Sequence, residues 1–394
     1  MDPLLRCFHH IEPRGEVFFP LSQAYFGDVD DPATECHCNL WDWDQLRFIK
    51  IKGPSKFFPP EDDAETSIFA QSLDYLSPDV REITIDSDGL LTGVSTDPDV
   101  DETAFAAYMP FSLCEHLVNC PKIYFSQLHE IGRLGPGVDL LSYNDQRVAF
   151  KFNPLRLPRQ LECSWREMNI ISKLPPHPNL VPFDNIVLED KESRIIGFTT
   201  KWIPGGRLSD PKKPFRLEWL QQLTQVVDFL NFELGIMHQD IAPRNLLIDP
   251  ESENILLFDF DCAAGGQDGL LEGRDDVTEI PHWNRKIDMI QNIEWTCDRE
   301  PDCDVSEFRQ FLNDWIANRT NGSMERYLNA PKRITWPAFQ DPPDYDVPFQ
   351  FSKTSTGEAK FRPGERYRRS ALKNGQYCFR WQRPPQRRQP VVPL

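Results

Sequence analysis

The chain has 394 residues, of which 40% are hydrophobic, and a net charge of −18. This length is consistent with two or three structural units, and the negative charge argues against a general nucleic-acid binder because phosphates would be repelled. The charge is uneven, with nineteen acidic and five basic residues between 28 and 102, but nine basic and one acidic between 361 and 390. We therefore expect the basic tail to dock on the acidic N-terminal region.

The first 120 residues mix short apolar runs with clusters of Pro, Asp and Ser. FIKIKGPSKFF (48–58) and REITIDSDGLLTGV (81–94) predict strands, and DSDG at 86–89 predicts a hairpin turn. No apolar run is long enough for a signal peptide or a membrane span, so we expect an intracellular protein, cytoplasmic or nuclear, with no membrane partner. The ten cysteines show no repeated CxxC pair at zinc spacing. They are expected to be free or buried thiols.

The pattern becomes clearer after residue 123. RVAFKF (147–152) alternates as a strand, with Val148 and Phe150 on one face and Lys151 on the other. LECSWREMNIISKL (161–174) has apolar residues at helical spacing and stops at two prolines, which predicts a helix. Two further strands are predicted from NIVLE and RIIGFTTKWI, at 185–189 and 194–203.

A long helix is predicted next. Leu220, Leu223, Val227, Leu230 and Leu234 form one apolar stripe that ends at Gly235. Two strand-like runs follow, NLLID and NILLFDF, joined by the turn PESE. DVSEFRQFLNDWIANR (304–319) predicts one more amphipathic helix. This order predicts an α+β fold in which a β-rich lobe is joined to a helical lobe, with a cleft between them.

Several segments resemble the protein kinase family and occur in that family's order. VAFK, ending at Lys151, resembles the VAIK strand, and the helix after it contains Glu167. TTKWIPGGRL resembles the linker between kinase lobes. HQDIAPRN, with Asp240 and Asn245, resembles HRDLKxxN, and DFD, beginning at Asp259, resembles DFG. The resemblance covers roughly residues 123–280, and HxDxAPRN is more narrowly similar to divergent kinase-like proteins of filamentous fungi.

The resemblance implies ATP and Mg²⁺ as cofactors and assigns roles to these residues. Lys151 would hold the α- and β-phosphates, with Glu167 as its ion-pair partner, although Glu162 lies on the same helix. Asn245 and Asp259 would bind Mg²⁺. Asp240 would orient the attacking hydroxyl. The predicted packing residues are His238 and Phe260.

The nucleotide-binding residues complete the prediction. Thr200 stands where kinases guard the adenine pocket, and Lys201 to Ile203 would offer backbone groups to the base. Gly135 and Gly137 match the first two glycines of GxGxxG, but Leu140 occupies the third position. These two glycines are therefore expected to approach the phosphates, although a simple turn is the alternative.

Other positions depart from the kinase pattern. Gln239 and Ala242 replace the usual Arg and Lys of the catalytic loop. CAAGGQDGLLEGR (262–274) is short, contains no Ser, Thr or Tyr, and is followed by Asp275 or Asp276 as the expected helix anchor. TEIPHWNRKIDMIQNIEW (278–295) lacks the apolar run of the helix that anchors a kinase's helical lobe.

The sequence thus predicts an acidic N-terminal extension (1–120), a kinase-like domain (121–325) and a Pro/Arg-rich tail (326–394). The predicted function is transfer of the γ-phosphoryl group of ATP to a hydroxyl, by default Ser or Thr of a protein. One alternative is a small-molecule kinase of the aminoglycoside-phosphotransferase type, because the short segment at 262–274 gives a peptide little to bind. The other is a pseudokinase or scaffold.

Overall fold

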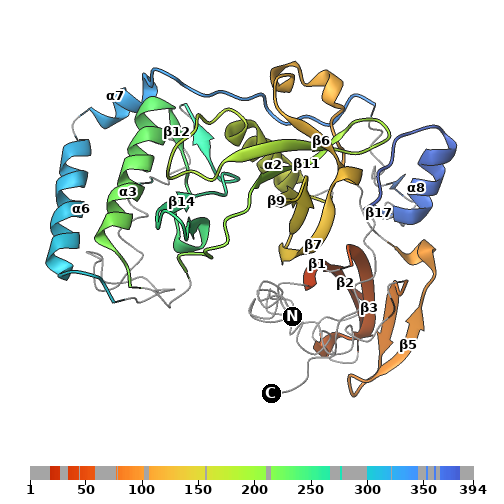
Figure 1. Cartoon of the computed structure of the whole chain (residues 1–394). Helices are drawn as coiled ribbons and strands as arrows, with labels where there is room; N and C mark the ends of the chain where they lie inside the picture. The colour runs from red at the N-terminus through yellow and green to blue at the C-terminus, as the bar shows by residue number, and fades with distance from the viewer. Residues whose placement is uncertain are drawn as a thin grey trace.

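The computed structural model describes residues 18–26, 34–43, 45–57, 77, 79–101, 106–155, 158–209, 214–266, 276, 300–320, 322–344, 352–353, 359–360 and 364–381. These residues form a mixed α+β architecture, consistent with a kinase-like fold (Figure 1). Two sheets of five and six strands account for most of the β-structure. Residues 278–295, which lack the apolar run of the helix that anchors a kinase's helical lobe, lie outside the described residues.

The N-terminal sheet has five strands in sequence order, β1 to β5. They are Phe18–Phe26, Glu35–Asp42, Arg47–Pro54, Glu82–Ile85 and Leu91–Ser95. The two predicted strand runs and the turn at 86–89 are confirmed, except that the first strand ends at Pro54 and a 3-10 turn follows. Cys36 and Cys38 are buried thiols on the apolar side of this sheet, as expected from alternation along a strand. No group of three or more metal-binding side chains occurs among the described residues.

The central sheet has six strands in the order β6-β10-β11-β9-β8-β7. Their bounds are Lys122–Tyr124 (β6), His129–Gly135 (β7), Val138–Tyr143 (β8), Gln146–Phe152 (β9), Phe183–Leu188 (β10) and Ile195–Lys201 (β11). The alternation predicted for β9 is confirmed: Val148 and Phe150 are buried, and Lys151 lies on the opposite, half-exposed face. The predicted helix that follows is α2, Pro158–Ile171.

The helical region contains α3 (Leu217–Asp228), α6 (Val305–Thr320) and α7 (Ser323–Leu328). All five apolar residues of the predicted stripe are buried. The α-helix itself ends at Asp228, and the last part of the stripe continues as a π-helical turn, η7 (Phe229–Glu233). Gly235 then adopts a φ of +62°, the conformation that glycine supplies at helix ends.

A short hairpin contacts both α3 and the segments that flank the strands β10 and β11 of the central sheet. β13 (Leu246–Ile248) pairs with β14 (Ile255–Leu257), and the linker after β11 lies along β13. The Leu208 N–H donates to the Leu246 carbonyl at 2.8 Å. A β-carbon on Gly205 would lie 1.7 Å from the Ile248 oxygen, so only glycine allows this approach. The loops that follow β12 (Ile236–Met237) and β14 are thereby placed beside the central sheet.

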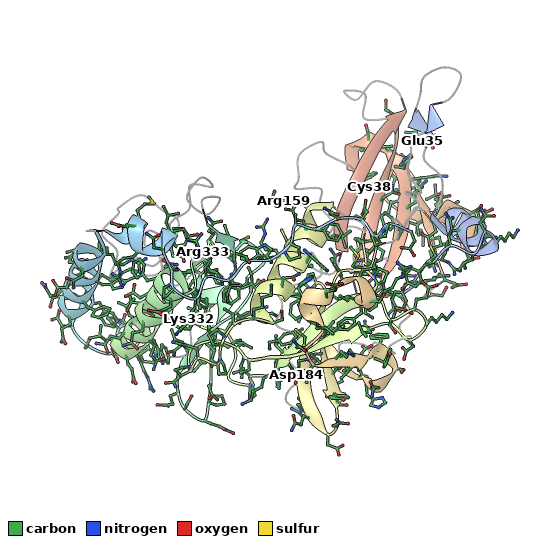
Figure 2. All side chains as sticks on the ribbon, turned by 90° about the horizontal axis from the view of Figure 1, so that it is seen from above. Glu35, Cys38, Arg159, Asp184, Lys332 and Arg333 are labelled. Atoms are coloured by element: carbon green, nitrogen blue, oxygen red, sulfur yellow. The ribbon has the colours of Figure 1, made fainter. Side chains whose placement is uncertain are left out.

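The N-terminal sheet packs on the central sheet through aromatic residues. Trp41 and Phe48 share one buried cluster with Phe150 and Phe152 of β9. Figure 2 labels Glu35 and Cys38 on the N-terminal sheet, which projects to one side of the central sheet. The cluster therefore joins a region of unknown role to the strand that carries Lys151.

The remaining elements are short. They are β15 (Ala264–Gly265), β16 (Ser352–Lys353), β17 (Ala359–Lys360), α8 (Gly364–Lys373) and the 3-10 turns at Ser55–Phe57, Pro98–Val100, Phe111–Leu113, Glu115–Leu117, Phe125–Gln127 and Pro243–Asn245. Among the described residues, none of the helices combines the length and the apolar character that crossing a bilayer requires.

Besides a hydrogen bond from the Trp381 indole N–H to the Tyr108 hydroxyl at 2.7 Å, the basic tail contacts the acidic N-terminal region through an ion pair between Arg369 of α8 and Asp99. Both side chains are substantially exposed, and an exposed pair of this kind contributes about 0–1 kcal/mol. The predicted docking of the whole tail therefore stays a prediction.

Candidate active site

Lys151 lies at the centre of a group of charged residues. Its Nζ atom is 2.6 Å from Oε2 of Glu167 and 2.6 Å from Oδ1 of Asp259. The three residues come from β9, α2 and the loop after β14. The structure thus brings together three of the predicted site residues. Lys151 and Asp259 are 108 positions apart in the sequence.

The pKa values of these groups are coupled through burial and charge. Burial opposes the charge of Lys151, but Asp259 and Glu167 raise its pKa well above 10.5. Burial raises the pKa of Glu167 from 4.5 to about 7, and Lys151 offsets only part of this effect. Burial also disfavours the charge of Asp259, yet the ammonium group of Lys151 outweighs it and lowers the pKa below 3.8. At neutral pH the site therefore holds a firmly charged lysine beside one firmly charged carboxylate.

Of the two glutamates on α2, the structure pairs Glu167 with Lys151. The Glu167 side chain is 4% exposed, and its Oε1 accepts a bond from the Phe260 N–H at 3.2 Å. Glu162 is 57% exposed and pairs with Arg166 one helical turn away. The structure therefore pairs Lys151 with the predicted Glu167, which is buried, and not with the exposed Glu162.

The predicted catalytic loop, residues 238–245, is closed by hydrogen bonds from Asn245. Its Nδ2 donates to Oδ2 of Asp240 at 2.6 Å and to the Asp240 carbonyl at 2.9 Å. Asn245 is 3% exposed, whereas the Asp240 side chain is 19% exposed. Arg244 forms an ion pair with Asp240, a contact that the sequence did not predict because the i, i+4 rule for opposite charges applies to helices and this stretch is a loop with a 3-10 turn.

A buried carboxylate holds this loop from behind. Asp276 accepts the backbone N–H of His238 at 3.0 Å and that of Gln239 at 2.8 Å. Asn231 donates to the same carboxylate at 2.9 Å. Asp276 is fully buried, and it rather than Asp275, which lies outside the described residues, makes these contacts. Three buried donors thus share one acceptor group, which fixes the start of the loop.

His238 and Phe260 connect the two loops, as predicted. Their rings are 4.7 Å apart and both are buried. The His238 imidazole also bonds the Phe258 carbonyl at 3.0 Å. This contact places the residue before Asp259 against the catalytic loop.

The backbone is strained at two site positions. Gln239 has a φ of +61° and Asp259 a φ of +69°, a region that residues with a side chain rarely adopt. Such conformations cost about 1–3 kcal/mol and persist where the surroundings fix them. Here the fixing contacts are the bond of Gln239 to Asp276 and the pair of Asp259 with Lys151.

The glycines predicted to cover the phosphates form a two-residue turn. Gly135 pairs with Val138 across β7 and β8, leaving only Pro136 and Gly137 between them. Gly137 has a φ of +65°, and a β-carbon there would lie 2.6 Å from the Phe152 oxygen. Proline followed by glycine suits a type II turn. The turn itself thus requires glycine at 137, whereas no atom of the described residues lies within 4 Å of a β-carbon on Gly135. The approach of both glycines to phosphates stays a prediction.

The linker residues lie at the end of β11. Thr200 is half-buried opposite Ala149, and Ile203 is 3% exposed. The Lys201 N–H donates to the Pro182 carbonyl at 3.0 Å, so Lys201 has its carbonyl rather than its N–H to offer to a base. The adenine contacts of Lys201 and Ile203 stay predictions.

The donor set fits a magnesium ion. Because both hydrogens of the Asn245 amide are directed to Asp240, its Oδ1 is the atom left for a cation. Asp259 likewise uses Oδ1 for Lys151, which leaves its second carboxylate oxygen. Mg²⁺ is typically held by one or two protein groups together with phosphate oxygens and water. A site of this kind does not need the three clustered ligands that the described residues lack.

Comparison with known proteins gives partial matches. No protein-family model matches the chain. CBL-interacting protein kinase 5 of Oryza sativa subsp. japonica is 34% identical over 164 residues, 36% of this chain and 34% of the kinase. Casein kinase II subunit alpha' of Saccharomyces cerevisiae is 29% identical over 123 residues, 30% of this chain and 35% of that subunit.

The probable serine/threonine-protein kinase MARK-C of Dictyostelium discoideum is 26% identical over 147 residues, 36% of this chain and 19% of that protein. The matches support a protein kinase-like superfamily. The chain spans about a fifth to a third of the length of these kinases. The narrower likeness to divergent fungal proteins stays a prediction.

Proposed function

We propose that this chain is an ATP- and Mg²⁺-dependent phosphotransferase with a two-lobed protein kinase-like fold, which transfers the γ-phosphoryl group to a hydroxyl. The observation that carries the proposal is the pairing of Lys151 with both Glu167 and Asp259 at 2.6 Å. One lobe would be the central sheet with α2, and the other the helical region. The proposed kinase-like unit is 121–325, preceded by an extension and followed by the tail.

Each side chain then has a physical task. Lys151 would bind phosphate oxygens as a point charge, kept extended by Glu167. Asn245 and Asp259 would hold Mg²⁺, which neutralises charge on the phosphates when bound. Asp240 would accept a hydrogen bond from the acceptor hydroxyl and orient it. Phosphoryl transfer depends mainly on such positioning and charge stabilisation.

The proposed acceptor is a Ser or Thr hydroxyl of a protein. This choice rests on the similar proteins, of which MARK-C is named a probable serine/threonine-protein kinase. A small-molecule hydroxyl is the second candidate. It is favoured by the sequence of 262–274, which is short and rich in glycine and so offers little surface for a peptide.

Nucleotide binding is the first test. A ligand at a hundred times its Kd stabilises the folded state by about 2.7 kcal/mol, so Mg·ATP should raise the Tm of the wild-type chain. Asp259→Asn should remove most of this shift, because it removes the charge that faces the metal. Asp314→Asn, an exposed position on α6, is the matched control and should keep the full shift. If the wild-type Tm does not change with Mg·ATP, the proposed phosphotransferase activity is wrong, and the pseudokinase or scaffold alternative is favoured.

Transfer is the second test. Asp240→Asn should retain the Mg·ATP shift yet lower the rate of transfer from labelled ATP by about a hundredfold or more, the usual effect of losing a catalytic base. Incubation with cell extract then separates the two acceptor classes: label in protein supports the first, and label in the low-mass fraction supports the second. Equal transfer by wild type and Asp240→Asn would exclude the role assigned to Asp240.

A further inference from the structure

A segment after α7 crosses from the helical region to the central sheet. We call residues 330–344 the brace. In Figure 1 it leaves α7 and runs along the upper side of the molecule toward the central sheet, and Figure 2 labels its early residues Lys332 and Arg333 beside the helical region. The N–H groups of Lys332 and Ile334 donate to the carbonyls of Glu233 and Leu234 at 2.9 and 3.0 Å. The brace is therefore anchored to the end of the α3–η7 helix.

The middle of the brace binds α2. The Trp165 indole N–H donates to the Pro337 carbonyl at 2.9 Å, and Lys173, just beyond α2, donates to the Thr335 carbonyl at 2.7 Å. The rings of Trp165 and Phe339 lie edge to face with centroids 6.1 Å apart. Contacts of this kind join the brace to the last part of α2 and to the turn that follows it, from residue 165 to residue 173.

The far end of the brace is fixed to the sheet. Asp344 forms an ion pair with Arg194, which is 4% exposed in its side chain and also donates to the Tyr108 carbonyl at 3.1 Å. Nearer the site, Trp336 packs on Gly265, where a β-carbon would come within 2.9 Å of the indole ring. The brace thus contacts the helical region, the segment after DFD, α2 and the sheet in turn.

Glu167 lies on the helix that this segment holds. A cavity of about 50 Å³ is lined by Lys151, Trp165, Met168, Phe198 and Phe339, among others. Phe339 and the Lys151 side chain therefore form walls of the same small cavity. Because Phe339 also packs on Trp165, truncating its ring would enlarge the space beside α2 and remove packing contacts from this helix.

In protein kinases, phosphorylation of the segment after DFG helps to position the helix that carries the paired glutamate. The corresponding segment of this chain has no residue that could be phosphorylated. Residues 262–274 contain no Ser, Thr or Tyr, and Gln239 replaces the arginine that would answer a phosphate there. We propose that the brace holds α2 so that Glu167 stays on Lys151, with Trp165 and Phe339 as positioning residues. The inference rests on the proposed function, but its first test does not need nucleotide.

Amide hydrogen exchange tests whether the brace holds α2. Phe339→Ala should raise exchange in α2 at least tenfold and leave α3 unchanged, because local opening follows the loss of local contacts. Phe311→Ala, which truncates a half-buried phenyl ring on α6, is the matched control and should leave α2 unchanged. Unchanged exchange in α2 of Phe339→Ala, or an equal rise in both helices, would overturn the proposal.

A double-mutant cycle tests whether the brace acts through Glu167. Phe339→Ala and Glu167→Gln should each raise the Kd of Mg·ATP about tenfold, and the double variant should bind like Glu167→Gln alone. Phe339→Leu should restore part of the affinity. Additive effects in the double variant would overturn the positioning role. Absence of Mg·ATP binding by the wild type would refute the proposed function, while hydrogen exchange would still decide whether the brace holds α2.

Discussion

The catalytic loop and the turn between β7 and β8 are the two regions that would face a nucleotide, and they are built differently. In the loop, His238 and Asn245 are almost completely buried, and side-chain acceptors hold the backbone N–H groups of His238 and Gln239. In the turn, two residues join the strands and nothing lies within 4 Å of a β-carbon on Gly135. Buried polar bonds allow one geometry, whereas the turn has few outside contacts, such as the bond from the Phe152 N–H to the Gly137 carbonyl at 2.8 Å.

The charged residues proposed to act in phosphoryl transfer are therefore positioned by different contacts from the turn proposed to cover the nucleotide. The charged residues are positioned by long-range contacts among β9, α2 and the loops after β12 and β14. The turn is positioned by the Phe152 carbonyl, which approaches Gly137, and Trp43 lies 3.7 Å from where the β-carbon of Gly137 would be. We therefore expect substitutions behind the loop to cost much stability and substitutions in the turn to cost little, except at Gly137.

The largest effect is expected at Asp276. Asp276→Ala removes the acceptor of three buried donors, from Asn231, His238 and Gln239. Each unsatisfied donor costs about 1–3 kcal/mol, so the free energy of unfolding should fall by about 4 kcal/mol. Urea denaturation measures this change. Asp314→Ala, at an exposed position, is the control and should change it by less than about 0.5 kcal/mol.

An equal, small loss for both aspartates would mean that the loop is not held from behind. The comparison between loop and turn would then lose its physical basis. A loss at Asp276 without any change in the Mg·ATP shift would instead show that stability and nucleotide binding are separable in this region.

Much of the site was predictable because its residues lie in short, ordered patterns. The alternation in RVAFKF placed Lys151 opposite the buried face, and the apolar stripe of α3 predicted five buried positions that are all buried. The spacing within HQDIAPRN and the nearby DFD brought Asp240, Asn245 and Asp259 into one prediction. In each case the signal is local, and the fold only had to bring complete segments together.

Other features could not be read from the sequence because they depend on tertiary contacts. Glu167 was preferred to Glu162 only through the family resemblance, since the physical difference between them is burial, which depends on the fold. The brace contacts of Trp165 with Pro337 span 172 positions and carry no sequence signal. The sequence also did not predict the π-helical turn at Phe229–Glu233. Over a single turn, apolar residues have the same spacing in a π-helix as in an α-helix.

The second prediction concerns the pH dependence of stability. The pKa of Glu167 is raised from 4.5 to about 7, so between these values the folded state retains a proton that the unfolded state has released. The contribution of Glu167 to stability must therefore fall as pH rises through this window. By the usual conversion the loss amounts to at most about 3 kcal/mol. The raised pKa of Lys151 and the lowered pKa of Asp259 act outside this window.

Glu167→Gln should remove this slope. Relative to wild type, the variant should gain stability between pH 5 and pH 8, as measured by urea denaturation at each pH. Glu162→Gln, on the same helix but exposed, should follow the wild-type profile. Parallel profiles for wild type and Glu167→Gln would show that the buried pair does not disfavour the carboxylate charge.

The smallest effects are expected in the turn, where two glycines give a matched pair. Gly137→Ala should lower stability by about 2 kcal/mol, because it forces a side chain into a positive φ and against the Phe152 carbonyl. Gly135→Ala should change stability by less than about 0.5 kcal/mol, since its surroundings are open. If Gly135 approaches phosphates, however, its substitution should raise the Kd of Mg·ATP about tenfold, because a methyl group would keep the backbone away. Unchanged affinity in Gly135→Ala would mean that the turn does not cover the nucleotide, and that binding depends on the charged residues alone.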